Sequence, residues 1–98
     1  MARFDVYHAP RIQGFLLDCQ ADLLDELDTR VVVPLLPTTA MIAATRLNPL
    51  FEIDGQSHIM QTPMIFSIPT ERLGPPVLSL SNCDLDIIAA LDMLFSGF

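Results

Sequence analysis

The sequence contains no lysine and no tryptophan, and only five arginines face twelve acidic residues, which gives a formal net charge of −7 at pH 7. The arginines stand singly, at positions 3, 11, 30, 46 and 72. A surface that follows a phosphate backbone needs clustered cations. The sequence therefore argues against direct nucleic-acid binding, and the acidic balance favours a basic protein partner.

Long apolar runs and a cysteine pattern are also missing. The longest candidate, VVVPLLP at 31–37, is far shorter than the roughly 18 residues of a membrane-spanning helix. Asp5 and His8 interrupt the first ten residues, so no signal peptide is expected. Cys19 and Cys83 lack the spacing of a metal site or a disulfide framework, which indicates buried free thiols. We expect a cytoplasmic protein that binds no membrane.

What the sequence has in excess is apolar side chains. Of its 98 residues, 51% are apolar and 17% charged, against roughly 25% charged in an ordinary globular domain. A single domain over 1–98 buries only roughly 60–65% of the surface that its unfolded chain exposes. The apolar surplus therefore favours a buried self-interface and predicts a homodimer.

Strand patterns dominate the first three quarters of the chain. Asp54-Gly55 is the strongest hairpin signal and joins two runs within 48–63. Pro34 cannot donate to a strand ladder, so the strand that contains it should bulge or reach an edge there. The segment 37–47 fits a loop, a helical turn or a short strand, and 70–77 reads as a loop. Further strands are expected over 3–9, 14–20, 30–36 and 64–69.

From Ser81 onward the periodicity becomes helical. Ser81 with Asp84 three residues later is typical of a helix start, and Gly97 of a helix end. Leu91, Leu94 and Phe95 are expected to pack against the rest of the protein. This order of elements predicts a mainly β fold, either a small antiparallel SH3-like barrel or two curved sheets, with one C-terminal α-helix.

No group of residues has the pattern of a catalytic or metal centre. His8 and His58 fall in different predicted hairpins, and Ser57 points to the opposite face of its strand from His58. The acidic run lacks the spacing of a calcium loop and is expected to be a solvated loop, or else a docking surface for a basic partner. It comprises Asp18, Asp22, Asp25, Glu26 and Asp28. We therefore predict no enzyme, no cofactor and no metal.

The last eight residues, LDMLFSGF, place two aromatic rings at the end of the predicted helix. Phe95 and Phe98 either cover the barrel and a dimer seam, or form an aromatic binding patch that a two-fold axis doubles. The residue pattern leaves both alternatives open.

Five stretches, in this order and over nearly the full length, resemble the CcdB toxins of type II toxin–antitoxin modules. They are RFDVYHA, LLDCQADLLD, TRVVVPLLP, NPLFEIDGQSHIMQTPMIFSIP and DLDIIAALDMLFSGF. The resemblance implies a barrel-like β fold related to the MazF and Kid toxins and an obligate homodimer. It also implies a toxin that binds the DNA gyrase A subunit, traps the cleaved DNA complex without chemistry of its own, and is wrapped by a cognate CcdA-like antitoxin that folds on binding.

Position by position, the resemblance assigns two groups of site residues. The gyrase-binding group is Asp92, Ser96, Gly97 and Phe98, and the antitoxin or gyrase surface is Arg3, Phe4, Ala21 and Leu23.

The sequence departs from the family pattern at Ser96, where the family has a tryptophan that stacks on arginines of gyrase. Either Phe95 or Phe98 replaces that contact, or gyrase binding is weakened or lost. Two alternatives remain: a MazF-like endoribonuclease, which would need arginines gathered in a groove, and a degenerate homologue that binds only antitoxin.

Overall fold

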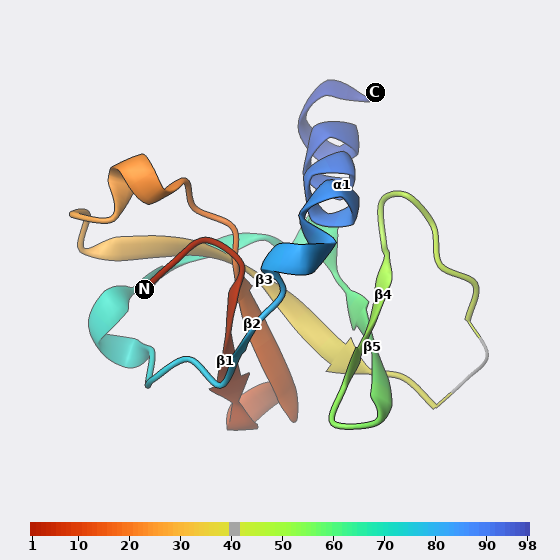
Figure 1. Ribbon diagram of the computed structural model, residues 1–98, viewed down its shortest axis with the longest axis horizontal. Helices are drawn as coiled ribbons and strands as arrows, with labels where there is room; N and C mark the ends of the chain where they lie inside the picture. Colours follow the sequence, from red (N-terminus) through yellow and green to blue (C-terminus); the bar gives the residue numbers. More distant parts are fainter. Residues whose placement is uncertain (40–41) are drawn as a thin grey trace.

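The computed structural model describes residues 1–39 and 42–98 (Figure 1). Strands and short 3-10 turns alternate through most of the chain, and one α-helix follows them. The strands are β1 (Asp5–Ala9), β2 (Gly14–Asp18), β3 (Thr29–Pro37), β4 (Leu50–Ile53), β5 (Gln56–Met60), β6 (Phe66–Pro69) and β7 (Leu78–Ser79). The 3-10 turns are η1 (Pro10–Ile12), η2 (Asp22–Leu24), η3 (Thr62–Met64), η4 (Thr70–Arg72) and η5 (Ser81–Cys83), and the helix is α1 (Asp84–Ser96).

The strands form one antiparallel sheet in the order β4-β5-β3-β2-β1-β7, and β6 pairs with β3 next to β5. The sheet curls into a half-barrel, and α1 rises from one end of it (Figure 1). The prediction of a mainly β, barrel-like fold with one C-terminal helix is confirmed. No helix in the described ranges is long and apolar enough to cross a membrane.

Pro34 lies where the partner of β3 changes. On the same side of β3, Thr29–Val32 pairs with β6 and Leu35–Pro37 pairs with β5. The carbonyl of Pro34 accepts the N–H of Gln61 at 2.9 Å. Because the N–H and C=O of a strand residue point to the same side, the missing N–H of Pro34 falls in this gap and costs no ladder bond.

The β4–β5 hairpin turns at Asp54 and Gly55, as predicted. Their φ values of 53° and 77° are those of the tight turn that suits the twist of a two-residue hairpin. In the segment 37–47, residues 37–39 and 42–47 form no helix, and residues 40 and 41 lie outside the described residues.

The main core lies between the concave face of the sheet and α1. From α1 it takes Ile87, Ala90 and Leu91, and from the strands mainly Val6, Phe15, Leu17, Val33, Leu35, Phe51, Ile53 and Met60. The predicted helix face was correct at Leu91, but Leu94 is only half-buried and Phe95 is 71% exposed. Because α1 is apolar on several sides, helical spacing alone did not decide which face packs.

The helix start was also predicted wrongly. Ser81 lies in the turn η5, where the N–H of Cys83 bonds to the carbonyl of Leu80 at 2.9 Å. Cys83 occupies the cap position of α1, and no side chain caps it. The buried Leu80 fixes this turn, so the chain enters the helix two residues later than predicted. At the other end Gly97 adopts the left-handed conformation and donates to the carbonyl of Met93 at 3.1 Å, as expected for a C-cap.

The segment 70–77 covers the opposite face of the sheet. It is anchored at one end by Thr70, whose N–H bonds to the carbonyl of Asp28, and at the other by Val77, which bonds to Val6. In Figure 1 it runs from the turn at Thr70–Arg72 back to the edge of β1. Asp18 and Arg30 are buried on this side of the sheet.

Asp18 therefore does not belong to a solvated acidic run. Its carboxylate lies 2.7 Å from the Arg30 guanidinium and is fully buried, whereas the other four acidic residues of the run are exposed. The expectation was wrong for this one residue because Asp18 is the last residue of β2 and points at β3, while the others follow in the loop.

Candidate binding surfaces

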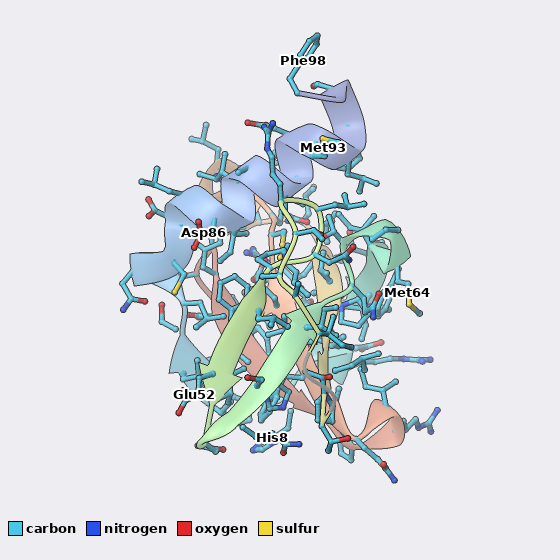
Figure 2. All side chains as sticks on the ribbon, turned by 90° about the vertical axis from the view of Figure 1, so that its right-hand side faces the viewer. His8, Glu52, Met64, Asp86, Met93 and Phe98 are labelled. Atoms are coloured by element: carbon cyan, nitrogen blue, oxygen red, sulfur yellow. The ribbon has the colours of Figure 1, made fainter. Side chains whose placement is uncertain are left out.

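The most exposed aromatic side chains lie at the end of α1. We call Phe95, Ser96, Gly97 and Phe98 the C-terminal tip. Phe95 is 71% and Phe98 80% exposed, and Ser96 and Gly97 are exposed as well. Gly97 has a φ of 76°, so the chain turns away from the helix axis before Phe98. Figure 2 shows Phe98 beyond the end of α1, pointing away from the sheet.

The tip combines two kinds of chemistry. Asp92 is exposed one helical turn before Ser96 and therefore lies on the same face of α1. Ser96 and Gly97 carry little side chain, which leaves the backbone accessible between the two rings. A carboxylate beside exposed aromatic rings suits a partner that offers apolar surface and a guanidinium. The four residues that the resemblance assigns to gyrase binding thus lie together at this end of α1.

The predicted antitoxin or gyrase surface is only partly exposed. The N–H of Arg3 bonds to the Asp22 carboxylate at 2.8 Å, and its Nε bonds to the carbonyl of Cys19 at 3.3 Å, which holds the N-terminal segment against η2. Leu23 in η2 is 95% exposed, and Ala21 is exposed before it. Phe4 does not join them, because its ring lies in the core and carries the Arg3 guanidinium 4.8 Å above it. Figure 1 shows the N-terminus and the turn η2 to one side of the sheet, away from the end of α1.

A groove of about 840 Å³ was not foreseen from the sequence. We call it the η1–β6 groove. Its walls are mainly apolar and include Leu16, Pro34, Met64, Phe66, Ile68 and Leu73. Arg11, Arg72 and His8 add polar groups to its lining, and within the described ranges neither arginine is engaged in an ion pair. These residues are far apart in the sequence and meet because β3 pairs with β2 on one side and with β6 on the other.

His8 and His58 both lie against the ring of Phe15. The Phe15 ring lies between them, with centroid distances of 5.1 Å to His8 and 5.2 Å to His58. His58 is buried and its Nδ1 lies 2.9 Å from the carbonyl of Gln56. This is a packing arrangement around an aromatic ring.

Titratable groups do not form a reactive cluster in the described part of the chain. Burial raises the pKa of the Cys19 thiol to about 12, which keeps it protonated and unreactive. Burial also raises the pKa of the Asp18 carboxyl and of the Tyr7 hydroxyl. No group of three or more His, Cys, Asp or Glu side chains among residues 1–39 and 42–98 could hold a metal ion.

The structure is a small β half-barrel with a C-terminal helix, and it exposes apolar side chains at the C-terminal tip and along the η1–β6 groove. The family model of the CcdB protein matches residues 3–97. The chain therefore belongs to the CcdB family, and this membership makes it a toxin of the toxin–antitoxin class.

Proposed function

We propose that this toxin acts without chemistry of its own: it binds the A subunit of DNA gyrase and traps the complex of gyrase with cleaved DNA. Family membership supports this target. The observation that carries the proposal is the pair of exposed rings, Phe95 and Phe98, at the free end of α1. Aromatic side chains at the centre of an interface commonly supply much of its binding energy.

In this proposal Phe98 takes over the contact that Ser96 cannot make. Phe98 is the most exposed aromatic residue of the described chain. It follows the left-handed turn at Gly97, so its ring is free to stack on an arginine of the target, with Asp92 as a nearby carboxylate. The active species is a homodimer, which presents two tips to one target. Light scattering should give twice the 10.9 kDa mass of one chain.

The antitoxin binds the η1–β6 groove in this proposal. A segment that folds on binding can place apolar side chains on Leu16, Pro34 and Phe66 and an acidic side chain beside Arg11 or Arg72. The group at Arg3, Ala21 and Leu23 remains a second proposed contact, because Leu23 is almost fully exposed.

The test is a DNA cleavage assay with purified gyrase, supercoiled DNA and ATP. The wild-type toxin should accumulate linear DNA. Phe98→Ala should need roughly 30-fold more protein to give the same amount of linear DNA, which corresponds to a loss of about 2 kcal/mol of binding free energy. Gly97→Glu should abolish the accumulation of linear DNA. Leu85→Ala is the matched control, since Leu85 is a 79% exposed apolar residue at the other end of α1. Unchanged cleavage by folded Phe98→Ala would refute the site.

One observation favours a second candidate, the endoribonuclease. The fold gathers two arginines and a histidine, Arg11, Arg72 and His8, along one groove, which is the kind of set that RNA cleavage needs. The groove walls are mainly apolar, and this suits a peptide better than a phosphate chain. We expect no cleavage of RNA without metal at micromolar protein. Cleavage that His8→Ala abolishes would establish the enzyme instead.

A growth assay tests the alternative of a degenerate homologue that binds only antitoxin. Induction of the toxin should arrest cells with ordinary gyrase and spare cells with a toxin-resistant gyrase A subunit. Harmless expression together with tight antitoxin binding would support a degenerate homologue.

A further inference from the structure

An arginine outside α1 contacts the C-terminal tip. Arg46 lies in the segment between β3 and β4 and is exposed. Its Nε donates to the carbonyl of Ala89 at 3.2 Å, and its Nη2 donates to the backbone carbonyl of Phe98. One guanidinium thus links the middle of the helix to the residue that follows its cap. The two residues are 52 positions apart in the sequence.

Arg46 is presented by a turn that is itself fixed to the sheet. The N–H of Asn48 bonds to the Thr45 Oγ1 at 3.0 Å, and the N–H of Thr45 bonds to the carbonyl of Asn48 at 3.2 Å. The Asn48 side chain donates to the carbonyl of Met60 at the end of β5, at 2.9 Å. A continuous set of hydrogen bonds therefore leads from β5 through this turn to the tip.

The C-terminal end of α1 has no cation of its own. The sequence from Asp84 to Phe98 contains no basic residue, and Asp92 puts a negative charge near the helix end. Carbonyl groups without intrahelical partners make a helix C-terminus electronegative, and a cation there is stabilising. Arg46 brings a cation beside this end of the helix from another part of the chain. The fixed geometry of its guanidinium lets it hold at once the carbonyls of Ala89 and Phe98, which flank the last turn.

We propose that Arg46 is a positioning residue for the tip. It fixes the backbone at Phe98, so that the Phe98 ring keeps one direction relative to Asp92 and Phe95 instead of rotating freely about Gly97. Glycine has the least restricted backbone of all residue types. Gly97 by itself would therefore not hold Phe98 in place. This inference rests on the proposed function, since it names a further residue that the proposed gyrase contact depends on.

Two measurements on Arg46→Gln test the inference. The first uses the free toxin: the backbone {1H}–15N NOE of Gly97 and Phe98 should fall, while that of Ala90 in the middle of α1 stays unchanged. The second is the dissociation rate from a gyrase A fragment, which should rise about fivefold, because a mobile contact loses part of its binding energy to ordering. The control is Glu52→Gln, which removes one charge from an exposed residue of β4 outside the proposed binding surfaces.

Two further variants distinguish positioning from charge. Arg46→Lys keeps the charge but not the two-point geometry, and should lower the Phe98 NOE to an intermediate value. Asn48→Ala leaves Arg46 in place but frees its turn from Met60, and should act in the same direction as Arg46→Gln.

The outcomes are separable. An unchanged Phe98 NOE in Arg46→Gln would overturn the inference, whatever gyrase binding does. A lowered NOE and faster dissociation support it. If the wild-type toxin does not bind gyrase at all, the proposed function fails, while the NOE still decides whether Arg46 orders the tip.

Discussion

The Asp18 carboxylate and the Arg30 guanidinium form an ion pair in which both side chains are 0% exposed and Oδ2 lies 2.7 Å from Nη2. Arg30 Nε also donates to the same oxygen at 2.9 Å, and the other carboxylate oxygen accepts the N–H of Gln20 at 3.1 Å. Gln20 in turn accepts the N–H of Val31 and donates to the carbonyl of Leu24. The pair therefore joins the end of β2 and the start of β3 to the loop that presents Leu23.

Removing one partner of this pair should be far more destabilising than replacing both. Asp18→Asn leaves the Arg30 charge buried without a counterion, so we expect the free energy of unfolding in urea to fall by about 3–5 kcal/mol. The double variant Asp18→Leu/Arg30→Met replaces the pair with apolar groups and should unfold near the wild-type midpoint or above it. A double variant that is less stable than Asp18→Asn would show that the pair stabilises the fold in its own right.

The two cysteines should differ sharply in reactivity. At pH 8 a thiol reagent should modify only the half-buried Cys83, because burial protects Cys19 and raises its pKa to about 12. Cys83→Ala should leave a native protein with no reactive thiol, and urea should then release one. Two reactive thiols in the native protein would contradict the burial of Cys19.

The same thiol predicts how stability depends on alkaline pH. The pKa of Cys19 is raised in the folded state above its ordinary value of 9.0, so its contribution is fully present below pH 9 and is lost as the pH rises toward 12. Tyr7, whose pKa is also raised by burial, acts in the same direction above pH 10. The midpoint of urea unfolding should therefore fall from pH 9 upward, and by less in Cys19→Ala.

Local signals predicted the hairpins, the edge of β3 at Pro34 where its partner changes, the helix and its glycine cap, because each depends on a few neighbouring residues. The packed face of α1 could not be predicted in the same way, since Ile87, Ala90 and Leu91 repeat as regularly as the positions around Phe95. The burial of Asp18 depends on its partner Arg30, which is twelve residues away. Such partners come together only through the pairing of strands.

The candidate sites also differ in whether their residues are neighbours in the sequence. The C-terminal tip is contiguous in sequence and was identified from the resemblance. The η1–β6 groove and the Arg46 contact join residues from distant segments, such as Arg11 with Arg72, and no short motif marks them. The register of β3 with β6 and the path of the loop before β4 create both.

Gly14 and Gly74 offer a matched test of the packing. A Cβ on Gly14 would lie 2.3 Å from the carbonyl oxygen of Leu35, a backbone atom that cannot move without disturbing β3. Gly14→Ala should therefore lower the free energy of unfolding by about 2 kcal/mol or more. Gly74 has nothing within 4 Å of the same position, so Gly74→Ala should leave stability unchanged or raise it by up to about 1 kcal/mol. Equal effects in a urea titration would contradict the close approach of β2 and β3.

Antitoxin binding should depend on the η1–β6 groove and on salt in two distinct ways. Phe66→Ser removes an exposed apolar wall of the groove and should speed dissociation from the antitoxin about tenfold, while gyrase cleavage is retained because the tip is untouched. The charge of −7 per chain, doubled in a dimer, should make association with a basic antitoxin faster at low salt. Stopped-flow measurement between 50 mM and 500 mM salt gives both the association rate and the dissociation rate. Association that does not change with salt would exclude charge steering, and loss of both antitoxin and gyrase binding in Phe66→Ser would show that the two surfaces are not separate.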